Sequence, residues 1–272
     1  GSVTVQQGET VVLVAACSSN PRPGLDFFPL QVDYRERFCA AGKFPGGYFK
    51  REGRPTEKEI LTARMTDRPL RPLFPDGYIQ DVQIMAQLWS ADGVNEPDTL
   101  SILGASAALM ISDMPFDGPI GALRVGRVNG QFVANPTTDQ MAESDLDLVY
   151  AGVPGKTIMI EGRSDELSEE QLRDALLFAD ERVCEQVEAL KELAERAGKE
   201  KHMPALSLVD PELQKAVDAY CAGKIEDACL VADKKALEKA TGEVAAAMIE
   251  GLAPTFGAPD GENAPDYKKA LD

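Results

Sequence analysis

The residues best suited to binding a polyanion are concentrated in one segment of this chain, residues 35–71. This segment contains ten Lys or Arg residues and five Asp or Glu residues, so its formal charge is +5. The whole chain carries a formal charge of −17, which leaves −22 outside the segment. A polyanion would therefore be attracted to this segment and repelled by most of the remaining surface.

An aromatic and basic motif lies at the centre of this segment. Tyr48, Phe49, Lys50 and Arg51 stand together in a glycine-rich loop, residues 42–53, and Arg54 follows. Proteins that bind single-stranded RNA use aromatic faces on which bases stack and cations that contact the phosphates. The loop matches neither G-x-x-x-x-G-K-[ST] nor G-x-G-x-x-G. The motif therefore favours RNA or another polyphosphate rather than a nucleotide-binding loop of either kind.

A helix is expected to position the second half of the segment. Thr56 and Glu59 form a capping box, which predicts that the helix begins at Thr56, and Pro69 predicts its end. Arg64, Arg68 and Arg71 are spaced so that they would line one face if helical geometry persists. The same arginines also fit a structural role, because arginines near a capped helix often pair with carboxylates. The available carboxylates are Asp67, Glu36 and Asp76.

Carboxylates offer a second kind of chemistry. Asp145 and Asp147 are two residues apart in a predicted strand, so both would project from one face and could hold a hard divalent metal. Solvation is the simpler interpretation, because Leu146 and Leu148 supply the buried face of that strand. A weaker metal hypothesis concerns two loop residues, Asp113 and Asp117.

Histidine-dependent catalysis is disfavoured, because His202 is the chain's one histidine. A Ser-His-Asp triad, a Cys-His dyad and a histidine-rich metal centre would each have to depend on it. Phosphoryl chemistry stays open, since it depends on Arg, Lys and metal positioning more than on a histidine base.

The composition is that of a soluble globular protein. The chain has 272 residues with 44% hydrophobic content, enough for one large domain or two ordinary ones. Its longest apolar runs, residues 11–17 and 105–111, are too short to span a membrane. The chain has five cysteines and no C-x-x-C motif, and we predict that these thiols are reduced and mostly buried. They are Cys17, Cys39, Cys184, Cys221 and Cys229. We expect a cytoplasmic protein.

The first part of the chain predicts an α+β fold. A hairpin with a turn at Gly8-Glu9 precedes strands at residues 28–34 and 82–90. Residues 98–112 predict a buried helix, with Asp98 as a possible N-cap, that belongs to the core. Two further hairpins are indicated by Asn129-Gly130 and Pro154-Gly155. These elements predict mixed sheets with helices packed on one side.

The pattern becomes helical after residue 162. Ser168 and Gln171 form a capping box at the start of a long amphipathic helix that ends at Gly198. A domain boundary is expected near residue 205. Beyond it we expect a helix beginning at Pro211, a second running from its cap at Asp233 to Glu250, a loop over residues 255–265 and a final truncated helix. The chain begins without Met, and we expect it to be a fragment of a longer protein.

Four motifs make the chain resemble bacterial polynucleotide phosphorylases. They are DFFPLQVDYRER (26–37), AAGKFPGGYFKREGRPTEKEILTARMTDRPLRPLFP (40–75), ILGASAALMISDMPFDGPIGALRVGR (102–127) and LDLVYAG (146–152). The resemblance predicts a first RNase PH-like core domain over residues 1–204, without its N-terminal strand, and a truncated all-helical linker domain over residues 205–272.

The resemblance also implies a function. Enzymes of this family assemble as ring-shaped homotrimers and degrade single-stranded RNA from its 3′ end by phosphorolysis, consuming inorganic phosphate and releasing nucleoside diphosphates. Phosphate and the divalent metal, here expected to be Mg²⁺, bind to a second core that these 272 residues do not contain. The first core contributes an arginine-rich loop, usually Phe-Phe-Arg-Arg, to the channel through which RNA passes.

Transfer of that loop onto matching positions gives the expected site. The implied RNA-binding residues are Tyr48, Phe49, Lys50, Arg51, Arg54, Arg68 and Arg71; no catalytic or metal-binding residue is expected in this chain. The sequence departs from the usual loop by Tyr for the first Phe and Lys for the first Arg. Lys50 keeps the charge but lacks the planar fork of arginine, so Arg51 and Arg54 are the better phosphate ligands.

The leading hypothesis is therefore an RNA-guiding and trimer-forming part of a polyribonucleotide nucleotidyltransferase that is inactive on its own. No membrane or DNA partner is expected. One alternative is a non-catalytic assembly module with incidental RNA contact. Another is an independent enzyme that uses Asp145 and Asp147 with a metal.

Overall fold

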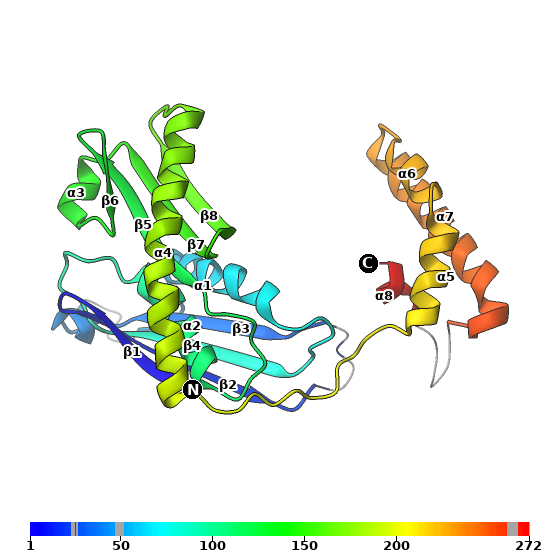
Figure 1. The fold of residues 1–272 in the computed structure, drawn as a ribbon, viewed down its shortest axis with the longest axis horizontal. Helices are drawn as coiled ribbons and strands as arrows, with labels where there is room; N and C mark the ends of the chain where they lie inside the picture. Colours follow the sequence, from blue (N-terminus) through cyan, green and yellow to red (C-terminus); the bar gives the residue numbers. More distant parts are fainter. Residues whose placement is uncertain (23–24, 26, 47–51, 260–265, 272) are drawn as a thin grey trace. The chain divides into compact units, whose positions relative to one another are not determined.

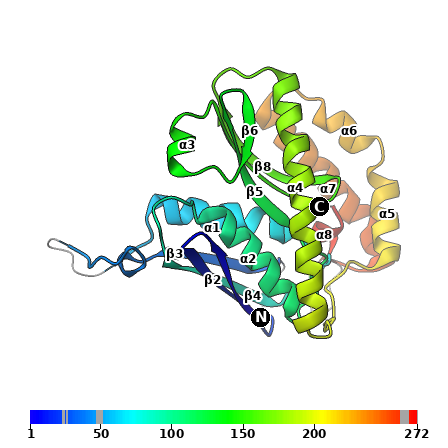
Figure 2. The ribbon, with the colours of Figure 1, turned by 60° about the vertical axis from the view of Figure 1, so that its left-hand side comes forward.

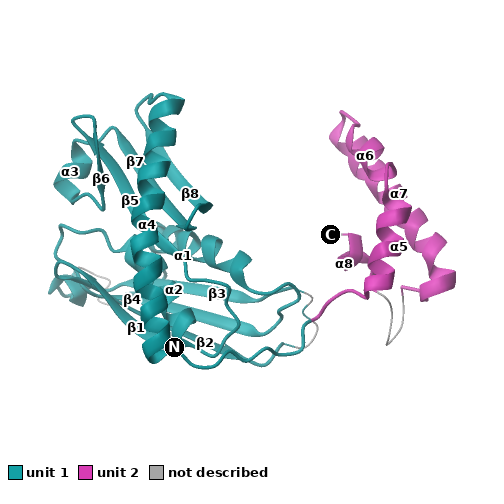
Figure 3. Cartoon of the chain, viewed as in Figure 1, with its two compact units in different colours: residues 1–206 teal, residues 207–272 magenta. Residues whose placement is uncertain are grey.

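A computed structural model of the chain describes residues 1–22, 25, 27–46, 52–259 and 266–271 (Figure 1). The chain divides into two compact units, Gly1–Leu206 and Ser207–Asp272 (Figure 3). The first unit contains two four-stranded sheets with helices packed against them, and the second is helical. The predicted α+β core is thereby confirmed.

The first sheet has the strand order β1-β2-β4-β3 (Figure 1). Its strands are β1 (Ser2–Gln7), β2 (Thr10–Ser19), β3 (Leu30–Glu36) and β4 (Asp81–Ser90). Strands β1, β2 and β4 pair antiparallel, whereas β3 runs parallel to β4. In β2, Val12, Val14 and Ala16 are buried while their neighbours are more exposed, the alternation expected for a sheet with one covered face.

Two helices cover that face (Figure 2). They are α1 (Glu57–Leu70) and α2 (Asp98–Ile111), and short 3₁₀ turns, η1 (Phe38–Ala41) and η2 (Arg71–Leu73), flank the α1 region. Helix α2 is buried on nearly all sides, as its apolar composition predicts. Its Gly104 lies so close to β1 and β2 that an added Cβ would be 2.5 Å from Val14 Cγ2.

The second sheet has the order β6-β5-β7-β8 and is antiparallel throughout. Its strands are β5 (Gly121–Val128), β6 (Gln131–Ala134), β7 (Leu146–Val153) and β8 (Lys156–Ser164). Asn129 and Gly130 join β5 to β6 with φ values of 50° and 78°, as a type I′ turn requires. The short helix α3 (Thr138–Ala142) precedes β7.

A long helix, α4 (Glu169–Ala197), covers the second sheet and also packs against α2 (Figure 2). The predicted capping box is present, because Ser168 and Gln171 each bond to the backbone of the other. Ala175, Ala179 and Val183 are fully buried against β5 and β7. These small residues let the helix approach the sheet closely.

The second unit has its own core. It contains α5 (Pro211–Cys221), α6 (Lys224–Cys229), α7 (Lys234–Phe256) and α8 (Tyr267–Leu271). Asp210 and Asp233 cap α5 and α7 as expected, accepting hydrogen bonds from the backbone N–H groups of Glu212 and Ala236. No helix in the described part of the chain combines the length and hydropathy needed to cross a bilayer.

Two predicted helix ends are wrong, and both involve proline. Helix α1 continues through Pro69 to Leu70, because both residues are buried in the core. Helix α7 passes Glu250 and Pro254 and ends at Phe256, so the predicted loop begins two residues too early. Phe256 packs against the core of the second unit, which offsets the hydrogen bond that a proline removes.

Two further predictions need correction. Asp98 is not the N-cap of α2, because that position is held by Pro97 and Asp98 is the first helical residue. The cysteines are not mostly buried. Cys17, Cys39 and Cys229 are exposed, Cys184 is half-buried and Cys221 is buried. Cys17 is exposed because its side chain alternates with buried Ala16 and so faces the open side of the sheet.

The close packing at Gly104 gives a stability prediction. Gly104→Ala should destabilise the first unit by about 1–3 kcal/mol, because the β-branched Val14 cannot move its methyl group without disturbing the core. Urea unfolding followed by circular dichroism measures the change. Gly242→Ala in α7 is the matched control, since its Cβ meets no atom within 4 Å. This second change should be stabilising by about 0.5–1 kcal/mol; equal effects would contradict the packing argument.

Candidate nucleic-acid interface

The basic segment is described on both sides of its centre. Tyr48, Phe49, Lys50 and Arg51 lie outside the described residues. Arg54 is exposed, and the part of the chain that the structure describes offers it no ion-pair partner. The sequence interpretation did not use Phe44, whose side chain is 92% exposed next to Lys43. The described flanks therefore present cations and an aromatic face to solvent.

The two flanks meet at the backbone of Phe38. The Phe38 N–H donates a hydrogen bond to Glu52 Oε1 at 2.6 Å, and its carbonyl accepts one from the Lys43 N–H at 3.0 Å. The second oxygen of Glu52 pairs with Arg37 Nη1 at 2.8 Å. Residues 43 and 52 are thus held at one point, directly after β3.

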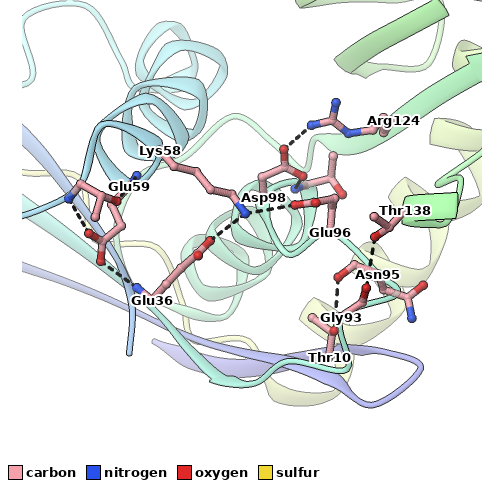
Figure 4. Close-up of polar contacts among 12 residues, drawn as sticks. Thr10, Glu36, Lys58, Glu59, Gly93, Asn95, Glu96, Asp98, Arg124 and Thr138 are labelled. Atoms are coloured by element: carbon pink, nitrogen blue, oxygen red, sulfur yellow. Dashed lines mark hydrogen bonds and ion pairs between the residues drawn. The ribbon is translucent and has the colours of Figure 1, made fainter. Parts of the chain in front are cut away.

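A second carboxylate, Glu59, fixes the start of α1 against the end of β3. Glu59 Oε2 accepts from the Thr56 N–H at 2.6 Å, which completes the predicted capping box. Glu59 Oε1 accepts from the Glu36 N–H at 2.9 Å (Figure 4). Burial raises the pKa of Glu59, but the backbone N–H groups of Thr56 and Glu36 outweigh it and hold this pKa below its ordinary value.

Lys58 connects the same region to the segment before α2. Its Nζ lies 3.4 Å from Glu36 Oε1 and 3.2 Å from Glu96 Oε2 (Figure 4). Burial lowers the pKa of Lys58, while the two carboxylates raise it, with a net increase. Tyr34, which is buried, also donates to Glu36 Oε1 at 2.8 Å. One oxygen of the Glu36 carboxylate is therefore bonded to both Lys58 and Tyr34.

The segment before α2 is itself held by backbone acceptors. Thr10 Oγ1 donates to the Asn95 carbonyl at 3.3 Å and Thr138 Oγ1 donates to the Gly93 carbonyl at 3.2 Å (Figure 4). These contacts connect the β1–β2 hairpin and helix α3 to one short loop. They fix the position of the acidic residue that starts α2, Asp98.

Asp98 forms an ion pair with Arg124 of β5 (Figure 4), and the other Nη of Arg124 pairs with Asp147 of β7. The Asp98 and Arg124 side chains are 8% and 16% exposed. Burial lowers the pKa of Arg124, but Asp98 and Asp147 outweigh it and raise this pKa. The Arg124 guanidinium thus joins α2, which covers the first sheet, to strands β5 and β7 of the second sheet.

The carboxylates considered for a metal site are occupied by arginine. Asp147 pairs with Arg124, and Asp145 lies 3.2 Å from Arg127 Nη1. The two are therefore not simply solvated. Across the described ranges, no three His, Cys, Asp or Glu side chains are arranged to hold a metal ion. Asp113 and His202 lie side by side, since the His202 N–H donates to the Asp113 carbonyl at 2.7 Å.

The three arginines of the α1 region do not share one face. Arg64 and Arg68 line a cavity of about 630 Å³ together with Lys58, Asp98 and Glu161. Arg68 pairs with Glu161, and both of these side chains are more than half exposed. Arg71 follows the helix and turns toward β3.

Arg71 holds the beginning of β3. It forms a two-point ion pair with Asp67 and donates to the carbonyl oxygens of Phe28 and Leu30 at 3.0 and 3.1 Å. Its guanidinium also lies over the Phe28 ring, 5.7 Å from the centroid. The alternative structural role that the sequence left open describes this side chain well.

A second groove of about 370 Å³ lies between β3 and α1. Arg35 and Arg64 line it, and neither has an ion-pair partner among the residues described. Arg35 was missed from the sequence as a candidate, although it belongs to the basic segment and follows the buried Tyr34 in β3. The acidic residues of this groove are Asp33, Glu59 and Asp67, and each accepts hydrogen bonds within the protein.

The fold is an α+β core. Arg35, Arg54 and Arg64, which have no ion-pair partner among the described residues, lie in the region of β3 and α1, an arrangement suited to a polyanionic substrate. A model described as "3' exoribonuclease family, domain 1" matches residues 1–115, and "3' exoribonuclease family, domain 2" matches residues 118–182. These matches cover more than half of the chain, which belongs to the 3′ exoribonuclease family.

Several curated relatives carry the same name, polyribonucleotide nucleotidyltransferase. The relative from Opitutus terrae is 54% identical over 219 residues, 80% of this chain and 30% of the relative. Those from Methylacidiphilum infernorum and Heliobacterium modesticaldum are 49% and 45% identical over 92% and 100% of this chain, and 36% and 38% of their own lengths. The chain spans about a third of these relatives. The resemblance predicted from the four motifs is confirmed.

The Arg124 ion pairs generate a stability prediction. Arg124→Met should destabilise the first unit by about 3 kcal/mol, because it leaves the nearly buried Asp98 carboxylate without its cationic partner. Arg127→Met is the matched control on the same strand, since its partner Asp145 is 40% exposed and can be solvated. We expect about 1 kcal/mol or less for the control. Chemical unfolding of both variants gives the comparison, and equal losses would contradict it.

The lowered pKa of Glu59 predicts a pH dependence. Its hydrogen bonds contribute stability at neutral pH, and this contribution should be lost as pH falls from the ordinary value of 4.5 through the lowered one. The free energy of unfolding of Glu59→Gln should therefore lie below that of the unchanged protein at pH 7, and the difference should shrink toward pH 3. A difference that stays constant over this range would show that ionisation of Glu59 does not matter.

Proposed function

We propose that this chain is the RNA-guiding part of a polyribonucleotide nucleotidyltransferase that degrades RNA in the 3′ to 5′ direction by phosphorolysis, releasing nucleoside diphosphates. The observation that carries the proposal is the extent of the similarity, since relatives of that name match 80–100% of this chain. The basic segment supplies the physical reason why RNA is the substrate held here.

The distribution of unpaired cations supports RNA binding. Arg35, Arg54 and Arg64 are without ion-pair partners in the described ranges and lie beside or within the basic segment. The chain is otherwise strongly acidic, with a net charge of −17. A polyphosphate would therefore be guided to this region by attraction here and repulsion elsewhere.

The individual roles follow from side-chain chemistry. Tyr48 and Phe49 would stack on bases, while Lys50, Arg51 and Arg54 would contact phosphates. Arg68 can exchange its exposed partner Glu161 for a phosphate at little cost, because exposed ion pairs contribute little stability. Arg71 would have to break four contacts to β3 and Asp67, so we assign it a supporting role.

Catalysis is assigned to residues outside this chain. Inorganic phosphate, nucleoside diphosphates and Mg²⁺ would bind to a second core, and the complete protein would act as a homotrimer in the cytoplasm. Phosphate-dependent release of ADP from poly(A) by the purified 272-residue chain would contradict this assignment.

An assembly role is the second candidate, and it is favoured by the open face of the first sheet. Met85 and Trp89, both on β4, are 47% and 54% exposed there. Large apolar side chains exposed together are typical of contacts with another protein surface. Trimers that form without measurable RNA affinity would favour this candidate over RNA guiding.

The RNA-binding proposal predicts a salt-dependent interaction that requires the basic segment. Arg51→Glu/Arg54→Glu should weaken binding of a 20-nucleotide oligo(A) at least 10-fold and make log Kd less steep against log salt, because fewer phosphates are contacted. Fluorescence anisotropy between 50 and 300 mM salt measures both quantities.

The control for that experiment reverses the same number of charges elsewhere. Arg173→Glu/Arg182→Glu changes two exposed arginines of α4. The control should alter affinity much less than the segment variant. Equal losses would mean that net charge, and not the basic segment, governs binding.

A further inference from the structure

Glu52 occupies an unexpected place for a carboxylate in an RNA-binding segment. It stands between Arg51 and Arg54 in sequence, where its negative charge would repel a phosphate backbone. Its side chain is 24% exposed, and both of its oxygens are bound within the protein. The charge is therefore directed inward, to Arg37 and the Phe38 N–H, and not toward solvent.

The partner of Glu52 is firmly connected to the sheet. Phe38 begins the turn η1, and the buried Ala40 in that turn accepts a hydrogen bond from the Ala91 N–H at 3.0 Å, just after β4. Because the Phe38 carbonyl also accepts from the Lys43 N–H, the backbone of one residue bonds to both described flanks of the segment. The Glu52 carboxylate thus fixes its own flank at the residue whose carbonyl already holds the Lys43 flank.

The contacts of Glu52 hold its side chain more firmly than an ordinary surface ion pair would. An isolated exposed pair contributes little, because side-chain entropy and salt offset the attraction. Here the carboxylate also accepts a charge-assisted hydrogen bond from a backbone N–H at 2.6 Å, which fixes its orientation. Glu57, five residues further on, is exposed and has no bonded partner in the part of the chain described, so it provides a natural comparison.

We propose that Glu52 is a positioning residue for RNA binding, which holds Arg54, on the flank opposite Lys43, in the orientation that contacts the phosphate backbone. This inference rests on the proposed function of the basic segment. It makes a counterintuitive prediction about charge. Removing a negative charge from an RNA-binding surface ordinarily increases affinity, whereas removing this one should decrease it.

The test measures oligo(A) binding by the 272-residue chain with Glu52→Gln and Glu52→Ala. The glutamine variant keeps an acceptor for the Phe38 N–H but loses the Arg37 pair, and the alanine variant loses both contacts. We expect affinity to fall about 3-fold and about 10-fold, respectively, with a shallower salt dependence. Glu57→Gln removes the same charge without a positioning contact, so its affinity should be unchanged or slightly higher. Unchanged or higher affinity in both Glu52 variants would overturn the proposal.

Coupling to Arg54 separates positioning from general stability. If Glu52 acts through Arg54, Glu52→Ala should cost less affinity in an Arg54→Glu background than in the unchanged protein. Equal costs would overturn the proposal, and so would a thermal midpoint that falls in parallel with affinity. If Arg51→Glu/Arg54→Glu itself leaves binding intact, the proposed function fails. If that variant weakens binding and the Glu52 variants do not, the positioning role alone fails.

Discussion

The first unit depends on the largely buried guanidinium of Arg124, which connects the second sheet to the helix that covers the first sheet. Arg124 projects from the second sheet to pair with Asp98, at the start of the helix that covers the first sheet, and with Asp147 on the neighbouring strand. Apolar packing between helices and sheets is non-directional and tolerates sliding. A charged pair in a poorly solvated place does not, because misalignment leaves a carboxylate unpaired. The ion pairs therefore set the register in which α2 meets β5.

That register determines where the basic segment lies. The residues just before Asp98 include Glu96, which pairs with Lys58 of α1, and Lys58 in turn pairs with Glu36 at the end of β3. A continuous series of polar contacts thus runs from the second sheet to the strand end from which the basic segment departs. The described flanks, which carry Lys43 and Arg54, begin at positions that the core fixes.

Local chemistry was predictable from the sequence, and long-range pairing was not. The capping boxes at Thr56 and Ser168 and the turn at Asn129-Gly130 are encoded within a few residues, and each is found as predicted. By contrast, the spacing of Arg64, Arg68 and Arg71 predicts one shared face, yet Arg71 lines a groove with Arg64 while Arg68 lines the other cavity. Arg71 bonds there to carbonyl groups of Phe28 and Leu30 that only the fold brings near. The same holds for Asp98. Aspartate is a common N-cap residue, but here its carboxylate pairs with Arg124, which is distant in sequence. Sequence spacing predicts which residues lie close together within one helix or strand. It does not predict which residue of another element will pair with them.

The pairing of the carboxylates explains how an acidic protein can present a cationic site. Within the basic segment, four carboxylates are consumed by internal contacts: Glu36, Glu52, Glu59 and Asp67. Glu36 bonds to Tyr34 and Lys58, and the other three fix a backbone N–H group or an arginine whose role is structural, such as Arg37 or Arg71. The cations left without ion-pair partners in the described ranges, among them Arg35, Arg54 and Arg64, are then available to pair with a polyanion. The bonded carboxylates fix the backbone of the basic segment, and the cations that remain without ion-pair partners attract a polyanion. The geometry of the site and its attraction for a polyanion therefore both follow from how the carboxylates are paired.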